Sequence, residues 1–356
     1  MTELADLLAR PSAPGAAPRI ARGLRSRWPA LTLGLVLLGG LAAPLATGVA
    51  VPGFFIEVLL GGLMAGVLYA LVALGFVLIY KSSGVFNFAQ GAMVLFAALT
   101  TARLAESMPV ALAFCIALAV MIVLAWLVER LVLRPLVNQD PQVLLMATLG
   151  VTYFIEGFGQ TVWGADVYKL DLGLPKEPII VLQRVFEGGV LIDREDIVAA
   201  AVAGLLVLLL ALFFQKTSTG RALRAVADDH QAAQSVGIAL NRIWVIVWSV
   251  AGFVALVAGM VWGSKLGVQF SLSEVALKAL PVVILGGLDS VPGAIVGGLI
   301  IGVGEKMAEV FLGPALVKAF SLAGGGIENW FAYVLAMLFL LVRPEGLFGE
   351  RRIDRV

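Results

Sequence analysis

The chain consists largely of apolar stretches, each about as long as a helix must be to cross a lipid bilayer. Such a helix needs about 20 consecutive apolar residues. The stretches lie at about 31–50, 56–80, 84–102, 110–133, 141–163, 197–215, 243–264, 275–289, 292–312 and 328–343. They predict an all-α, polytopic transmembrane helical bundle with about 8 to 10 membrane segments.

Composition narrows the class of protein further. The chain is 60% hydrophobic and 14% charged, whereas soluble domains contain roughly 45–50% and 25%, so a soluble enzyme is excluded. One cysteine, Cys115, and one histidine, His230, exclude an intrachain disulfide and a zinc site built from Cys and His ligands. We expect Cys115 to pack as a small hydrophobic side chain. The net charge of +1 gives no support for nucleic-acid binding.

Two of the apolar stretches are interrupted. The third opens with the polar residues Asn87 and Gln90, and the eighth contains Lys278, Pro281 and a pair of glycines. We expect both to be broken or re-entrant segments. Irregular backbone at membrane depth is tolerated only where it is buried in protein or faces a wet cavity, so such segments are candidates for a solute pathway.

Basic residues are distributed unevenly among the loops. Lys and Arg in short loops favour the cytoplasmic side of a membrane. Alternating segments would put the following on one side: Arg10, Arg19, Arg22, Arg25, Arg27, Lys81, Arg130, Arg134, Lys216, Arg221, Arg224, Arg242, Arg343, Arg351, Arg352 and Arg355. We therefore predict that both termini and the loop at 216–242 are cytoplasmic. The polar loop at 165–196, in which acids outnumber bases, is predicted to be extracytoplasmic.

The predicted domain organisation is simple. Residues 1–29 are rich in Arg, Pro and Ala and are predicted to form a disordered, basic cytoplasmic tail. Residues 30–349 form the transmembrane domain, and residues 350–356 form a second cytoplasmic tail. A cleaved signal peptide is the alternative for residues 1–50, although the apolar run there is longer than a usual signal sequence requires.

The loop at 216–242 contains a short amphipathic helix by its pattern. Ser218 or Thr219 can cap its start, and Gly237 occupies the position where a left-handed residue ends many helices. The apolar residues recur at spacings of three and four, which suits a helix that lies in a groove of another protein. They are Ala222, Leu223, Val226, Ala233 and Val236. A solvated connecting helix is the alternative.

Three separated blocks resemble one known family. They are GGLMAGVLYALVALGFVLIYKSSGVFNFAQGAM at Gly61–Met93, GRALRAVADDHQAAQSVGI at Gly220–Ile238 and ALPVVILGGLDSVPGAIVGGLIIG at Ala279–Gly302. In this order they resemble the permease subunits of ATP-binding-cassette (ABC) importers for branched-chain and other hydrophobic amino acids. The resemblance extends from about residue 56 to the RPEGLFG motif ending at Gly349. Within that family the chain is more similar to the first of the two usual permease paralogues.

The resemblance implies a transport subunit rather than an enzyme. In such permeases the loop helix is a coupling helix that docks on the ATP-binding subunit. Matching positions imply these coupling residues: Gly220, Arg221, Arg224, Ala225, Asp228, Ala232, Ala233, Gly237 and Ile238. ATP with Mg would bind on partner subunits, because this chain has no G-x-x-x-x-G-K-[ST] phosphate loop, and no cofactor is expected on this chain.

The resemblance also implies partners and a location. The expected partners are a second homologous permease subunit, two cytoplasmic ATP-binding subunits, a periplasmic substrate-binding protein and membrane lipid. The expected location is the bacterial inner membrane, which the chain crosses several times. The expected cargo is a branched-chain amino acid or a related small solute.

The candidates for the solute pathway are Phe86, Asn87, Gln90 and Lys278. Asn87 and Gln90 are three residues apart, so on a helix their amides share one face. Family members often have a His at the position of Gln90, and the departure removes a titratable group. The structural alternative is that both amides satisfy backbone groups at a helix break. Lys278 could line a cavity or extend toward the membrane interface.

Other features have structural interpretations. Glu305 and Glu309 share a helical face near the predicted outer end of their span, where solvating a charge costs little. Glycines four residues apart let transmembrane helices approach closely, within one subunit or at a seam between two permeases. These pairs are Gly62 with Gly66, Gly259 with Gly263, Gly293 with Gly297, and Gly298 with Gly302.

Two other classes of function remain as rivals. A secondary transporter or channel that works alone would need an intramembrane carboxylate for ion coupling. An intramembrane enzyme would need paired catalytic groups at one depth, which a single His, a single Cys and scattered carboxylates hardly provide.

Overall fold

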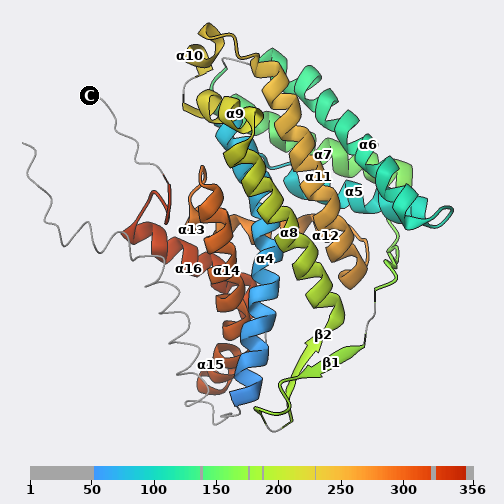
Figure 1. The fold of residues 1–356 in the computed structure, drawn as a ribbon, viewed down its shortest axis with the longest axis vertical. Coiled ribbons are helices and arrows are strands. Elements are labelled where there is room, and N and C mark those ends of the chain that lie inside the picture. Colours follow the sequence, from blue (N-terminus) through green and yellow to red (C-terminus); the bar gives the residue numbers. More distant parts are fainter. Residues whose placement is uncertain are drawn as a thin grey trace, which may run out of the picture.

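The structure is a computed structural model, and it describes residues 52–136, 139–174, 177–186, 188–228, 230–321 and 326–349. Both predicted cytoplasmic tails, the first apolar stretch and the possible signal peptide lie outside the described residues. The described chain is predominantly helical (Figure 1).

Five helices in the described part are long and apolar enough to cross a membrane. They are α4 (Pro52–Ser83), α6 (Val110–Val128), α7 (Pro141–Trp163), α8 (Arg194–Lys216) and α11 (Leu240–Leu266). A π-helical turn, η1 (Glu129–Leu133), and a short 3-10 turn, η2 (Arg134–Leu136), extend α6. The 32 residues of α4 span about 48 Å at 1.5 Å per residue, longer than a hydrocarbon core.

Both predicted interruptions are present. Residues 84–89 are not helical, and α5 (Gln90–Ala105) follows them. The second interruption divides a longer unit into two arms that meet at 116°. The first arm contains α12 (Leu272–Val275), η3 (Ala276–Ala279) and α13 (Leu280–Gly286), and the second contains α14 (Val291–Met307), η4 (Ala308–Leu312) and α15 (Gly313–Phe320).

The predicted count of eight to ten membrane segments is not confirmed. The described residues contain five helices long and apolar enough to span a membrane, or six candidate spans if the bent pair is one span. Two of the predicted stretches form helices of only 16 residues, α5 and α16 (Ile327–Val342). Such helices are shorter than the roughly 20 residues that a span requires.

The centre of the bundle is the seam between α4 and α14, which lie side by side in Figure 1. A Cβ added at Gly66 would lie 2.7 Å from the Gly298 carbonyl oxygen, and one added at Gly62 would lie 2.8 Å from the Cα of Val303. A Cβ at Gly302 would overlap the backbone of Gly66. These glycines therefore pack two helices of the same subunit backbone against backbone.

The loop at 165–196 departs from the all-α prediction. Strands β1 (Pro178–Val181) and β2 (Val190–Asp193) form an antiparallel hairpin in which Ile179 pairs with Ile192. The Leu191 N–H donates to the Glu57 carboxylate at 3.1 Å, which connects the hairpin to the start of α4. Figure 1 shows the hairpin at the opposite end of α4 from α9 and α10.

Candidate coupling surface and solute pathway

The predicted coupling loop forms two short helices, α9 (Ser218–Asp228) and α10 (His230–Ser235). The cap of α9 is neither of the predicted residues: the Thr217 hydroxyl accepts from the Gly220 N–H at 3.1 Å. Gly237 has φ of 88°, the left-handed conformation predicted for the end of the helical segment, which glycine adopts without steric cost.

The apolar face of α9 packs inside its own subunit. Leu223 and Val226 are buried, and α9 contacts the ends of α4, α8 and α11. The expectation that the apolar residues together form a face for another protein is therefore wrong for these two, because the adjoining spans already cover them. Val236, which directly follows α10, is exposed.

The corner between α8 and α9 is held by close backbone packing. A Cβ at Gly220 would overlap the carbonyl of Phe214, so the sharp turn requires glycine. The Arg224 guanidinium donates to the same carbonyl oxygen, which satisfies an acceptor at the end of α8. Gly220 and Arg224 therefore hold α9 against the membrane domain.

The remaining predicted coupling residues differ in exposure. Ala233 is buried, and Ala225 and Ile238 are half-buried. The exposed ones are Arg221, Asp228, Ala232 and Gly237. The predicted residues that face outward from this segment therefore carry either a charge, as Arg221 and Asp228 do, or little or no side chain, as Ala232 and Gly237 do.

A cavity of about 240 Å³ lies beneath α9. Its walls come from α4, α8, α9 and the bend between α13 and α14, and they include Lys81, Leu223, Arg224, Ser290 and Phe348. The Lys81 ammonium donates to the Asp289 carbonyl oxygen at 3.2 Å. Helix α9 therefore adjoins the bend between α13 and α14 across one cavity.

The bend itself is fixed by the C-terminal turn of the described chain. The Leu347 N–H donates to the Leu285 carbonyl oxygen at 2.8 Å, and the Phe348 N–H donates to the Gly286 carbonyl oxygen at 3.0 Å. These bonds satisfy carbonyls at the end of α13 that its own helix leaves unpaired.

The break at 84–89 is closed internally. Asn87 and Gln90 are fully buried. The Ala89 N–H donates to the Asn87 side-chain oxygen at 3.0 Å, and the Gln90 amide donates to the Ala251 carbonyl oxygen at 3.4 Å. The Thr148 hydroxyl accepts from the Phe88 N–H at 3.4 Å. This geometry matches the structural alternative for Asn87, whereas the Gln90 amide bonds a carbonyl inside α11 rather than at the break.

Two further contacts pack the same break. A Cβ at Gly75 would overlap the Gln90 amide, so Gly75 provides the space that Gln90 fills. The ring of Phe86 stacks on that of Phe76, with centroids 4.9 Å apart. Neither Asn87 nor Gln90 lines the cavity beneath α9 or a second, more open groove formed by apolar side chains of α6, α8 and α11. A pathway role for Phe86, Asn87 and Gln90 stays a prediction.

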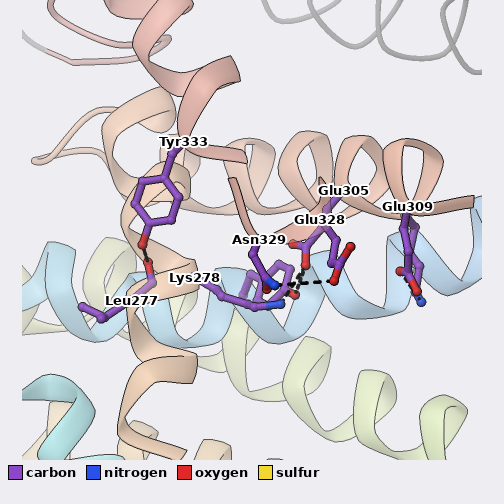
Figure 2. Close-up of polar contacts among 9 residues, drawn as sticks. Leu277, Lys278, Glu305, Glu309, Glu328, Asn329 and Tyr333 are labelled. Atoms are coloured by element: carbon purple, nitrogen blue, oxygen red, sulfur yellow. Dashed lines mark hydrogen bonds and ion pairs between the residues drawn. The ribbon is translucent and has the colours of Figure 1, made fainter. Parts of the chain in front are cut away.

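Lys278 belongs to a polar cluster that the sequence did not indicate (Figure 2). Its ammonium donates to the Glu305 carboxylate at 3.0 Å, and the Tyr69 hydroxyl donates to the same oxygen at 3.1 Å. The side chain of Glu305 is 8% exposed and that of Lys278 is 35% exposed. Glu309 pairs with Lys306 at 2.8 Å on an exposed surface, so the two carboxylates predicted to share one face have different surroundings.

The structure brings the two interrupted segments together. A Cβ at Gly91, the second residue of α5, would overlap the Ser273 carbonyl oxygen and lie 3.3 Å from the Cβ of Ala276. The break that contains Asn87 therefore packs on the segment that leads to Lys278. The residues predicted to couple to a partner form a separate group, on α9, α10 and the residues that follow, at the end of the bundle (Figure 1).

The candidate metal ligands and the cysteine of the described residues can be placed directly. No three His, Cys, Asp or Glu side chains in this part of the chain lie close enough to hold a metal ion. Cys115 is exposed on α6 rather than packed, contrary to our expectation, because it faces away from the bundle.

Comparison with known proteins gives a consistent picture. The family described as "Branched-chain amino acid transport system / permease component" matches residues 58–343. The permease protein LivH of a high-affinity branched-chain amino acid transport system from Salmonella typhimurium is 28% identical, over 85% of this chain and 98% of the relative. The corresponding protein BraD from Pseudomonas aeruginosa is 29% identical over the same shares.

One solved structure is also similar. A chain of PsaBC from Streptococcus pneumoniae, in complex with Fab, is 13% identical with a TM-score of 0.45, covering 81% of this chain and 93% of that chain.

Proposed function

The chain belongs to the family of branched-chain amino acid transport permeases, and from that membership we propose that it is the membrane permease subunit of an ATP-driven ABC importer. Its cargo would be a branched-chain amino acid or a related small solute. The observation that carries the proposal is the extent of the match, which covers nearly all of the described membrane helices. Five long apolar helices support a multi-pass membrane protein.

The proposed reaction is translocation without covalent change to the solute. A periplasmic substrate-binding protein delivers the solute, a second homologous permease completes the pathway, and two cytoplasmic subunits bind and hydrolyse ATP. ATP binding can drive transport only if it selects between inward-facing and outward-facing states that contact the solute differently.

We propose that α9 and α10 form the surface that docks on an ATP-binding subunit. Exposed Arg221 and Asp228 can make oriented charge contacts at the rim of a docking site. The cavity beneath α9 is also lined by α4, α8 and the α13–α14 bend, so a displacement of α9 would change the contacts of that bend.

We also propose that the chain lies in the bacterial inner membrane with both termini cytoplasmic. The uneven distribution of Lys and Arg supports this orientation. It places α9 and α10 on the cytoplasmic side and the β1–β2 hairpin outside.

Reconstituted uptake tests the proposal. Proteoliposomes containing this chain with both permease and ATPase partners should accumulate labelled leucine only when ATP and the binding protein are supplied. The chain alone should accumulate none under an imposed proton or sodium gradient. Gradient-driven uptake by the chain alone would instead support the rival of a stand-alone transporter.

A charge reversal tests the coupling surface. Because Arg224 also holds the α8–α9 corner, the cleaner variant reverses the two exposed charges, Arg221→Glu with Asp228→Lys. We expect substrate-dependent ATP hydrolysis by the assembled complex to be lost while the affinity of the binding protein for leucine is unchanged. Arg103→Glu with Glu106→Lys reverses an exposed pair far from α9 and is the matched control. Unchanged hydrolysis in the first variant would refute the coupling assignment.

A further inference from the structure

Glu305 has an unusual position for a carboxylate. Among the charged side chains of the described residues, only those of Glu129 and Glu305 are buried. Glu305 contacts Tyr69, which precedes Lys81 by twelve residues of α4 and so lies about 18 Å along the helix from it. A hydrocarbon core is about 30 Å thick. If Lys81 lies at one boundary, the Tyr69–Glu305 contact is well inside the membrane rather than at the outer end expected from the sequence.

The charge of Glu305 is neutralised but not sealed from the surface. Lys278 pairs with it and remains 35% exposed. On α16, the Tyr333 hydroxyl donates to the Leu277 carbonyl oxygen at 2.8 Å, and Asn329 lies one turn earlier on the same face. Figure 2 shows Glu328 and Asn329 projecting toward the same polar region as Lys278 and Glu305.

Lipid cannot solvate such a surface. Within a membrane, the Lys278 ammonium, the Asn329 amide and the carboxylates of Glu305 and Glu328 must face water or protein, because each charge left in hydrocarbon costs at least a few kcal/mol. The outward faces of α6 and α8 form the contrast: their exposed side chains include Leu112, Val123, Leu205 and Leu209. The surface at Lys278 is thus unlike the lipid-facing surface of the same subunit.

The backbone beside this polar surface is also irregular. Lys278 lies in the 3-10 segment η3, and the π-helical segment η4 begins three residues after Glu305. A 3-10 stretch within a helix often marks a hinge, and π-helical turns within helices are frequent at functional sites. One partner of the Lys278–Glu305 ion pair thus lies within an irregular segment, and the other lies just before one.

Resting on the proposed function, we propose that the surface around Lys278, between η3 and the first turns of α16, binds the charged groups of a zwitterionic amino acid during transport. The Lys278 ammonium binds the solute carboxylate, and the carboxylates of Glu305 and Glu328 bind the solute ammonium. In the empty site Lys278 and Glu305 neutralise each other. An arriving zwitterion gives each a new partner of opposite charge, so no charge is left unpaired during the exchange.

Tyr69 is a positioning residue in this site. Its hydroxyl holds one oxygen of Glu305, and its ring stacks on that of Trp262 at a centroid distance of 5.9 Å. It fixes the carboxylate without contacting the solute.

Thiol accessibility in the assembled complex tests the proposal. Asn329→Cys in a Cys115→Ser background places a thiol beside the site without breaking the ion pair. A membrane-impermeant thiol reagent should label it several-fold faster than Val123→Cys, an exposed control on α6. Saturating leucine should slow labelling of residue 329 and leave residue 123 unchanged. Equally slow labelling at both positions would mean that lipid covers this face and would overturn the proposal.

Leucine analogues test the assigned chemistry. Leucinamide lacks the carboxylate and 4-methylpentanoate lacks the ammonium, so each should protect residue 329 more weakly than leucine. Adding Lys278→Met should weaken protection by leucine roughly 30-fold or more, as expected for loss of a charged hydrogen-bonded partner, while Lys278→Arg should retain most of it. Equal protection by all three compounds would overturn the proposal.

The same preparation separates this proposal from the proposed function. If the unsubstituted complex imports leucine with ATP but leucine fails to protect the thiol of the Asn329→Cys variant, the site is wrong and the permease assignment stands. If that complex does not import leucine at all, the proposed function itself fails.

Discussion

The two interrupted segments have similar sequence signals and different structures. The break at 84–89 contains amides that are fully buried and bonded within the subunit. The segment around η3 contains a charge that is paired but partly exposed. A neutral amide can replace the bonds that an interrupted backbone loses, and it can then be sealed. A charged pair in the membrane needs water or protein on its open side. The break at 84–89 therefore supports the fold, whereas the segment around η3 has an open charged side that can bind a solute.

The largest effect should come from unpairing the charge. Lys278→Met leaves Glu305 buried without its cation, which costs about 3–5 kcal/mol in typical buried pairs. Thermal or denaturant unfolding of the purified subunit in detergent should measure this loss against the unsubstituted protein. A cost below about 1 kcal/mol, the level of exposed pairs, would mean that water already solvates Glu305.

A double variant sharpens the same comparison. Lys278→Met combined with Glu305→Gln removes both charges and leaves Tyr69 an acceptor, so most of the lost stability should return. Leucine uptake by the assembled complex should stay low, because the solute would still lack its charged partners. Recovery of both stability and uptake would show that the Lys278–Glu305 pair has a structural role only.

The next effect concerns the contact between the two breaks. Gly91→Ala would push a methyl group into the Ser273 carbonyl, and backbone yields less readily than a side chain. We expect a loss of about 3 kcal/mol, at the upper end for overpacking. Gly150→Ala, where the added methyl meets nothing within 4 Å, is the matched control in the same unfolding measurement and should cost little.

A smaller effect should follow from removing an amide of the closed break. Asn87→Ala leaves the buried Ala89 N–H without its acceptor, a loss of about 2 kcal/mol. Uptake per folded complex should be unchanged if Asn87 only supports the fold. A loss of uptake that exceeds the loss of folded protein would give Asn87 a pathway role after all.

The smallest effect should come from Thr148→Val. The hydroxyl accepts from the Phe88 N–H and lies 3.2 Å from the Phe86 carbonyl oxygen, so its removal should cost about 1 kcal/mol. Thr161→Val, which removes a hydroxyl bonded only within its own helix on an exposed surface, should cost less in parallel melts.

The sequence predicts the positions of both breaks because Asn, Gln, Gly and Pro stand out in an apolar stretch. It also predicts the left-handed Gly237 and the close glycine contacts of α4. It fails where distant residues meet. Nothing in the pattern pairs Tyr69 with Glu305, which lies 236 residues away along the chain.

The other differences from prediction have local physical causes. The pattern of α9 gives the correct apolar face, but the partner of that face is set by the fold, which turns Leu223 inward. The described residues do not confirm the predicted segment count, because α5 and α16 are helical for only 16 residues each.

The glycine seam between α4 and α14 has a mechanical consequence. Where Gly66 meets Gly298 and Gly302, backbone lies against backbone with no room for an added methyl group, so the two helices are held at one short separation. Tyr69 and Glu305 lie three residues beyond Gly66 and Gly302, and their hydrogen bond joins the same two helices. The place of the Glu305 carboxylate is therefore set by contact between two backbones rather than by flexible side chains.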